Sequence, residues 1–197
     1  PGRLIPAAAH RRVFLRHQAD HVIAKEPPHV QVLGRTGPVA NHDVDGALRQ
    51  ADPSVGAIVL TGEGGHFCSG GDLKNIAAAN LDNGGWLGRM QTLHEWVQVL
   101  LTLDRPVIAA VDGAAAGAGF SLALAADFVL ATPTARFCLS FMKLGLVPDC
   151  GAYYTLPRVV GAQRAKELML SAREVAAAEA LQLGIVMELH DAAALLP

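Results

Sequence analysis

The sequence predicts an α/β fold in which buried strands lead through small-residue turns into helices. The clearest case runs from Arg105 to Asp127, where the apolar run 107–111 is typical of a buried strand. Residues 113–119 are all glycine or alanine, and the residues after them are small or apolar on nearly every face, as in a fully buried helix. Strand, glycine-rich turn and helix recur in the same order between residues 56 and 79. Two such units indicate a sheet covered by helices.

Length and composition are those of a single domain with a sizeable core, since the chain has 197 residues of which 51% are hydrophobic. The net charge of -2, without a long run of either sign, argues against nucleic acid or an anionic membrane as a partner. Three cysteines without paired spacing indicate free thiols in a reducing compartment. No apolar run reaches the roughly 18 residues of a membrane span. We therefore expect a soluble cytoplasmic protein.

The first 46 residues show no clean periodicity. Three short apolar runs are candidates for strands, at Val13–Leu15, Val22–Ala24 and Val30–Leu33. His17 and His21 have the spacing of two metal ligands on one helix face, but no cysteine or carboxylate completes a recognisable set, so we expect surface histidines. We divide the chain into an atypical N-terminal segment (1–46), a core (47–190) and a tail (191–197).

The core has a regular pattern of further elements. We predict strands over 56–60, 128–131, 135–139 and 185–189, helices over 73–79, 86–103 and 153–170 with a break at Gly161, and a polar loop over 81–85. The helix over 86–103 is amphipathic, and its period puts both tryptophans in the core. Ser171 with Glu174 three residues later predicts an N-cap and a helix over 171–180.

Two small-residue turns, 68–72 and 113–119, are candidates for a binding site. Gly70 and Gly71 expose backbone amides in the first turn, and a buried helix begins at the second. Free N–H groups and the positive end of a helix dipole stabilise negative charge on an oxygen atom. Either turn alone is more often structural. Together they predict a site in which each turn donates one N–H to the same oxygen.

Asp149 is an acidic residue among apolar neighbours in the turn 148–151. A solvated aspartate is the default interpretation for such a turn. The alternative is a desolvated carboxylate that is basic enough to move a proton near neutral pH. The neighbours that would desolvate it are Leu146, Val147, Cys150, Tyr153 and Tyr154. The thiols of Cys68 and Cys150 have no base nearby in sequence, so we expect small buried cysteines.

Four segments, in order, resemble the crotonase superfamily, the enoyl-CoA hydratase and isomerase family of acyl-CoA enzymes. They are AIVLTGEGGHFCSGGDL, RPVIAAVDGAAAGAGFSLALAAD, LGLVPDCGAYYTLPRVVG and SAREVAAAEALQLGIV. The resemblance implies a crotonase-like spiral of ββα units whose C-terminal helical region is truncated here. It also implies an acyl-CoA substrate, no metal, no cofactor beyond the coenzyme A of that substrate, and a homotrimer or a dimer of trimers.

By position, the resemblance implies that the N–H groups of Gly71 and Ala118 form an oxyanion hole for the thioester carbonyl. Asp149 lies where some isomerases of the family hold their base. Family hydratases carry two glutamates at the positions of Ser121 and Phe141, so the resemblance favours isomerisation through an enolate over hydration. The residues assigned to substrate binding are Ser69, Gly70, Asp72, Leu73, Gly117, Ser121 and Phe141.

Two alternatives stay open. One is a hydratase-like binder of CoA thioesters with weak or no turnover, because neither Ser121 nor Phe141 can hold a proton for water addition. The other is a serine hydrolase, because residues 119–123 approximate a nucleophile elbow, and Asp149 and His190 follow in the matching order. The elbow ends in alanine rather than glycine, which counts against the hydrolase.

Overall fold

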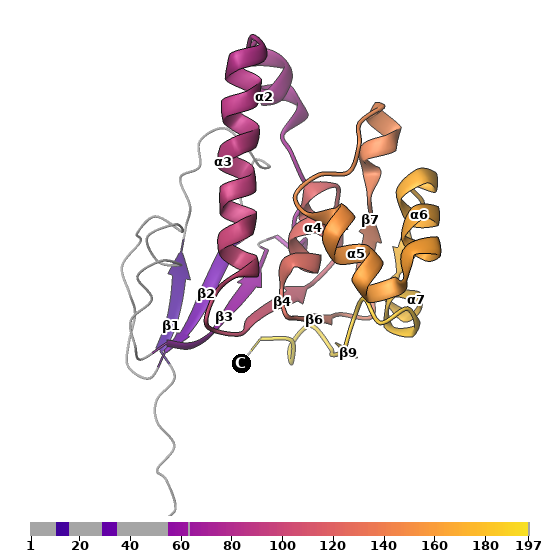
Figure 1. The fold of residues 1–197 in the computed structure, drawn as a ribbon. Helices are drawn as coiled ribbons and strands as arrows, with labels where there is room; N and C mark the ends of the chain where they lie inside the picture. Colours follow the sequence, from indigo (N-terminus) through magenta and orange to yellow (C-terminus); the bar gives the residue numbers. More distant parts are fainter. Residues whose placement is uncertain (1–10, 16–28, 35–54, 63, 197) are drawn as a thin grey trace, which may run out of the picture.

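The computed structural model describes residues 11–15, 29–34, 55–62 and 64–196 (Figure 1). A mixed sheet of six strands, in the order β1-β2-β3-β4-β6-β9, runs through the molecule. Its strands are β1 (Arg11–Leu15), β2 (His29–Gly34), β3 (Val55–Thr61), β4 (Val107–Val111), β6 (Phe128–Ala131) and β9 (Glu188–Leu189). The pairs β1–β2 and β2–β3 are antiparallel, and the pairs from β3 to β9 are parallel.

A second sheet of three short strands has the order β5-β7-β8. Its strands are β5 (Ala114–Ala116), β7 (Arg136–Cys138) and β8 (Val175–Ala176). The helices are α2 (Leu73–Ala78), α3 (Asn83–Leu101), α4 (Ala118–Ala125), the 3₁₀ helix η1 (Ser140–Leu144), α5 (Ala152–Val160), α6 (Ala162–Ser171) and α7 (Ala177–Gln182).

The chain alternates between the two sheets before each helical segment. From β4 it passes to β5 and then into α4, and from β6 it passes to β7 and then into η1 and α5. After β3, Cys68 forms a parallel bridge with Ala115 of the second sheet before α2 begins. This succession is the predicted spiral of ββα units.

The centre of the fold is β4 followed by α4, as the sequence predicts. All eight residues of α4 are buried, because the helix is enclosed on every side. The ring of Phe120 on α4 meets Phe137 of β7 with centroids 5.2 Å apart, which ties the helix to the second sheet. The predicted helix over 153–170 is also found, as α5 and α6 separated by Gly161.

Helix α3 departs from the prediction at its start and at one tryptophan. It begins at Asn83 because Asp82 caps it, with Asp82 Oδ1 accepting a hydrogen bond from the Gly85 N–H at 2.8 Å. The predicted loop over 81–85 is therefore wrong for its last three residues. Both tryptophans are half-buried, but only Trp96 packs against the core, whereas Trp86 lies under the Arg89 guanidinium, 5.6 Å from the ring centroid.

The predicted helix over 171–180 is found only in its last four residues, as the start of α7, and is wrong before them. Ser171 is the last residue of α6, and its Oγ accepts a hydrogen bond from the Arg173 N–H at 3.3 Å instead of capping a new helix. Two strand residues of β8 intervene before α7. The guanidinium of Arg173 holds this connection, with Nε 2.7 Å from Glu167 on α6 and Nη2 2.6 Å from Glu179 on α7.

At the N-terminal end, two of the three candidate strands are found, within β1 and β2. The run Val22–Ala24 and the pair His17 and His21 lie outside the described residues. The division of the chain at residue 46, the homotrimer and the cytoplasmic location stay predictions. No described helix is long and apolar enough to cross a membrane. Among the described residues, no three His, Cys, Asp or Glu side chains are grouped to hold a metal.

Replacing a helical glycine by alanine is expected to have opposite effects on stability at two positions. On Gly119 of α4 a Cβ atom would collide with the carbonyl of Cys68, whereas on the exposed Gly88 of α3 it would meet nothing within 4 Å. We expect Gly119→Ala to lower the free energy of unfolding by about 3 kcal/mol, because backbone must move to make room. Gly88→Ala should raise it by about 0.5–1 kcal/mol through helix propensity. Urea unfolding of both variants measures these changes in the free energy of unfolding. Equal changes in the two variants would contradict the close approach at Gly119.

The Arg173 cluster predicts a sensitivity to acid. Hydrogen bonds from Arg173 are the largest cause that lowers the pKa of both Glu167 and Glu179 below the ordinary 4.5. A carboxylate with a lowered folded-state pKa stabilises the fold above its ordinary pKa and loses that contribution as the pH falls through the lowered value. Unfolding free energy measured from about pH 6 to about pH 3 should therefore fall less steeply in Arg173→Gln than in the wild type. If the free energy of unfolding fell equally steeply with pH in Arg173→Gln and in the wild type, the prediction would be contradicted.

Candidate active site

The first turn is fastened to β5 through its backbone. The N–H groups of Phe67 and Cys68 both donate to the Ala114 carbonyl at 3.1 Å, and the Ala116 N–H donates to the Cys68 carbonyl at 2.8 Å. A further hydrogen bond joins the Ala114 N–H to His66 Nδ1 at 3.3 Å. The loop after β3 therefore aligns with β5 as if it were a fourth strand of the second sheet.

The second turn lies directly against the first. A Cβ atom on Gly70, whose φ is +91°, would stand 2.9 Å from the Ala116 carbonyl oxygen and 3.2 Å from the Ala118 nitrogen. Gly117 has a φ of 53° at the N-cap of α4, and its N–H donates to the Cys138 carbonyl at 2.8 Å. Only residues without side chains permit this approach of two backbones. The structure thus brings together the two turns that the sequence singled out.

Gly71 and Ala118 lie at the junction of the two turns. Within the described part of the chain, neither N–H donates to another backbone group. Gly71 follows the glycine that abuts Ala118, and Ala118 is the first residue of α4, where a helix leaves its N–H groups free and its dipole is positive. Their role as an oxyanion hole stays a prediction, and the free donors are the groups that such a role requires.

Asp149 begins a tight turn before α5. Cys150 and Gly151 both have positive φ, +51° and +80°, and for a residue other than glycine this conformation is strained. The turn packs on α3, where Val97 Cγ1 lies 3.2 Å from the place that a Cβ of Gly151 would take. Asp149 Oδ1 is buried and has no hydrogen-bond partner among the described residues. A buried carboxylate oxygen without a partner is a candidate for contact with a ligand.

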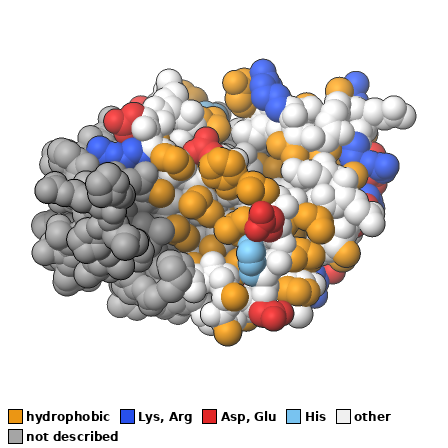
Figure 2. Space-filling model, turned by 90° about the horizontal axis from the view of Figure 1, so that it is seen from below, with side chains coloured by type: hydrophobic (Ala, Val, Ile, Leu, Met, Phe, Trp, Pro, Cys, Tyr) orange, Lys and Arg blue, Asp and Glu red, His pale blue; other side chains and the backbone are white. Residues whose placement is uncertain are grey.

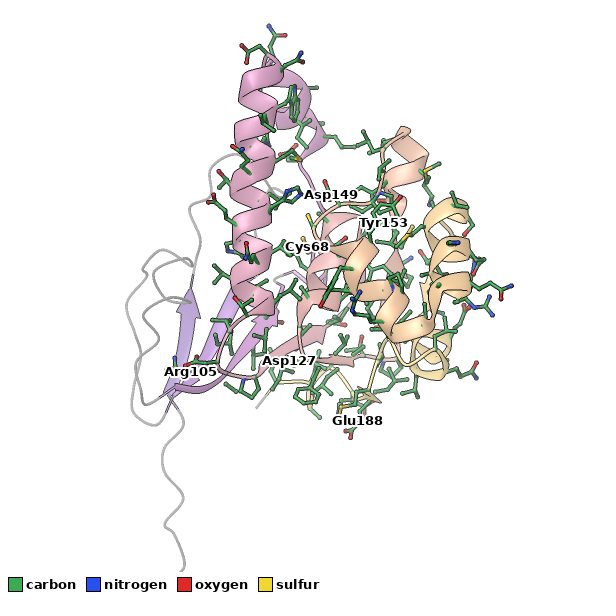
Figure 3. The ribbon with its side chains drawn as sticks, in the orientation of Figure 1. Cys68, Arg105, Asp127, Asp149, Tyr153 and Glu188 are labelled. Carbon is green, nitrogen blue, oxygen red and sulfur yellow. The ribbon has the colours of Figure 1, made fainter. Side chains whose placement is uncertain are left out.

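The predicted enclosure of Asp149 is largely wrong. Leu146, Val147, Tyr153 and Tyr154 are each more than half exposed, because the connection after η1 and the first turn of α5 direct them outward. Of the five expected neighbours only Cys150 is buried. Asp149 lies instead between α3 and α5, in the same region as Cys68 and Tyr153 (Figure 3). The turn that contains Asp149 contacts α3, and this contact places Asp149 between the two helices. The sequence pattern did not indicate the contact.

The thiols beside the site are buried, as predicted. Burial raises the pKa of Cys68 and of Cys150, and the negative charge of Asp149 raises the pKa of Cys150 further. Cys68 also contributes to the shift at Cys150, which reflects the proximity of the two side chains. Both sulfurs are therefore protonated and weakly nucleophilic near neutral pH.

Ser121 and Phe141 lie close to the start of α4. Ser121 is completely buried, and its Oγ donates to the Gly117 carbonyl one turn back at 3.4 Å. Phe141 is buried in η1, whose first residue, Ser140, has its Oγ 3.2 Å from the position of a Cβ on Gly117. Both candidate substrate-binding positions thus adjoin the second turn, and neither side chain titrates.

The serine hydrolase alternative is wrong, because its three residues are not assembled. Ser121 Oγ is buried against its own helix, and His190 Nε2 lies 3.1 Å from Glu188. Glu188 lies at the lower edge of the molecule, well apart from Asp149 (Figure 3). Seen from that end, hydrophobic side chains surround a few acidic ones and a histidine (Figure 2).

The remaining predicted residues of the first turn differ in exposure. Ser69 and Leu73 are exposed, whereas Gly70 is buried. Asp72 Oδ1 accepts a hydrogen bond from the Lys74 N–H at 3.0 Å, which caps the start of α2. Sequence reasoning missed His66, which bonds to β5, because no sequence period marks this contact. The period placed Trp96 in the core but did not predict that its Nε1 would be buried without a described partner.

The ββα units and the paired turns at their centre define the crotonase fold. An enoyl-CoA hydratase/isomerase from Cupriavidus metallidurans CH34, known from a crystal structure, aligns with a TM-score of 0.71 at 48% identity over 77% of this chain and 58% of that one. A family model described as enoyl-CoA hydratase/isomerase matches residues 41–196. The chain belongs to the enoyl-CoA hydratase/isomerase family.

Curated relatives differ in the reactions that their names state. A protein named "Probable enoyl-CoA hydratase" from Rhodobacter capsulatus is 41% identical over 158 residues, which cover 80% of this chain and 61% of the relative. The 1,2-epoxyphenylacetyl-CoA isomerase of Escherichia coli K12 is 39% identical over 147 residues, 72% of this chain and 55% of that protein. The chain thus spans a little more than half the length of these relatives.

Burial of the two thiols predicts a simple labelling result. In the folded protein at about pH 8, iodoacetamide should leave Cys68 and Cys150 unmodified, because their raised pKa leaves little thiolate and the sulfurs are enclosed. Both should react fully in about 8 M urea, where the pKa returns to its ordinary range near 8.5. Peptide mass spectrometry identifies the labelled residues. Rapid labelling of Cys150 in the folded state would contradict its placement.

Proposed function

We propose that this protein acts on acyl-CoA thioesters by moving a carbon–carbon double bond through an enolate, with Asp149 as the single base. The observation that supports this proposal is the buried Oδ1 of Asp149, the only buried carboxylate oxygen without a hydrogen-bond partner among the residues that the structure describes. Coenzyme A would enter as part of the substrate, and the reaction would need no further cofactor.

In this mechanism the two backbone turns carry the charge and Asp149 carries the proton. The Gly71 and Ala118 N–H groups would donate to the thioester oxygen, so that it can accept negative charge. The Asp149 carboxylate would take a proton from C2 of a 3-enoyl-CoA, and the electrons of that C–H bond would delocalise into a dienolate. Return of the proton to C4 would then give the 2-enoyl-CoA. One acid–base group suffices because the proton that leaves is the proton that returns.

The neutral residues at the start of α4 favour isomerisation over hydration. Water addition needs a group to activate the water, and the positions where family hydratases carry glutamates hold Ser121 and Phe141. Ser121 is also fully buried and bonded to its own helix. The relative named 1,2-epoxyphenylacetyl-CoA isomerase is, by its name, an isomerase that acts on a CoA compound, which is compatible with this chemistry.

A thioester binder with weak or no turnover is the second candidate. It is favoured by the exposure of Leu146, Val147, Tyr153 and Tyr154, which leaves Asp149 without the predicted apolar enclosure. Binding without reaction would distinguish this candidate.

The decisive experiment compares Asp149→Asn with the wild type on a 3-enoyl-CoA and a 2-enoyl-CoA. Double-bond migration and water addition are followed separately. We expect the wild type to isomerise and Asp149→Asn to lower kcat by about 10³-fold or more, because the amide cannot accept the proton. The Kd for the thioester should change little, since the donors of the two turns are backbone groups.

Asp104→Asn is the matched control, because Asp104 is exposed and its contact with Arg105 is long, at 3.8 Å. It should leave both reactions unchanged. Hydration that survives in Asp149→Asn would overturn the role of Asp149. Thioester binding without either reaction in the wild type would favour the second candidate.

A further inference from the structure

His66 connects the two turns of the candidate site, although its side chain is exposed. It lies in the loop after β3, and its Nδ1 accepts a hydrogen bond from the Ala114 N–H of β5 at 3.3 Å. Because the backbone N–H is the donor, Nδ1 is the acceptor in this hydrogen bond. No other contact between these two segments involves a side-chain acceptor among the hydrogen bonds of the described residues.

This hydrogen bond completes the attachment of Ala114 to the loop. The Ala114 carbonyl accepts from Phe67 and Cys68, and the Ala114 N–H donates to His66, so both backbone groups of one residue are held by three consecutive loop residues. Gly113, with a φ of +59°, has no room for a side chain, since a Cβ would stand 2.7 Å from His66 Nδ1. The ring therefore fits closely over the turn between β4 and β5.

The attachment sets the relative position of the two predicted donors. Gly71 lies three residues after Cys68, and Ala118 lies two residues after Ala116, whose N–H donates to the Cys68 carbonyl. Between them Gly70 and Ala118 are in close backbone contact. A shift of the loop along β5 would therefore move the Gly71 N–H relative to the Ala118 N–H. Donors of an oxyanion hole stabilise charge only when both reach the same oxygen.

We infer that His66 is a positioning residue for the oxyanion hole, which holds the first turn in register with β5 so that the Gly71 and Ala118 N–H groups reach one carbonyl oxygen. This inference rests on the proposed function, because it assumes that the two N–H groups bind a thioester carbonyl. It assigns His66 no contact with the substrate. The requirement is an acceptor at the position of Nδ1, and not a proton donor or acid–base group.

Two substitutions separate the acceptor from the rest of the side chain. The Oδ1 of asparagine can take the position of Nδ1, whereas the carboxamide of glutamine reaches the position of Nε2. His66→Asn should therefore keep the hydrogen bond to Ala114, and His66→Gln should lose it. Both residues are polar and fit an exposed position, so we expect both variants to fold. Amide exchange at Ala114 should be faster in His66→Gln than in His66→Asn.

The effect of each substitution on hydrogen bonding to the thioester carbonyl is measured with a thioester that cannot react. Butanoyl-CoA with ¹³C at the thioester carbonyl is bound to each protein, and the carbonyl resonance is measured by NMR. Hydrogen bonds to the oxygen polarise the carbonyl and move this resonance downfield. We expect a downfield shift in the wild type and in His66→Asn, and a shift smaller by about half in His66→Gln, because one of two donors is misplaced. If the protein turns over, kcat should fall by about 5- to 10-fold in His66→Gln alone.

Each outcome decides between the inference and the proposed function. The same downfield shift in all three proteins would overturn the role of His66 and leave the proposed function standing. Equal Ala114 exchange in the two variants would also overturn it. A wild type that binds butanoyl-CoA without any downfield shift would overturn both, because the two N–H groups would then not bind the carbonyl.

Discussion

Close approach of two backbones, at Cys68 and at residues 114–118, is the constraint on which the site depends. Three hydrogen bonds join the segments, and glycines at 70 and 119 leave space for carbonyls that any side chain would displace. Because α4 starts at Ala118 and all of it is buried, a change at this contact cannot relax into solvent. The same contact therefore supports the core and determines where free N–H groups lie. Stability and the predicted chemistry share one set of residues.

Sequence reasoning found the parts of the fold that local patterns encode. The strand before α4 and the buried helix itself follow from apolar runs, and the two turns follow from glycine and alanine. The pairing of β5 with its neighbours could not be predicted, because three alanines carry no strand period and the pairing is tertiary. The helix expected after Ser171 failed for the same reason, since Arg173 binds glutamates on both flanking helices.

The sequence singled out the residues of the candidate site, but it predicted their surroundings only in part. Asp149 stood out because it is charged among apolar residues, yet sequence proximity gave the wrong neighbours. A turn with two positive φ values directs the flanking side chains outward and brings the turn against α3, some 50 residues away in sequence. His66 carried no signal at all, because an exposed histidine in a glycine-rich loop looks like any surface residue. Positions set by turn geometry and by contacts distant in sequence are the ones that pattern analysis misses.

The charge distribution around α4 gives a physical reason why one carboxylate would suffice for the proposed isomerisation. The residues that adjoin the start of this helix, Ser121 and Phe141, are neutral, so no protein carboxylate at those positions competes for the positive end of the helix dipole. Negative charge that develops there would be that of the bound substrate. Asp149 lies on a different element, the turn before α5, so that the group proposed to move the proton would be separate from the groups proposed to stabilise the charge. Such a division suits a reaction in which a proton leaves and returns while the charge stays on one oxygen.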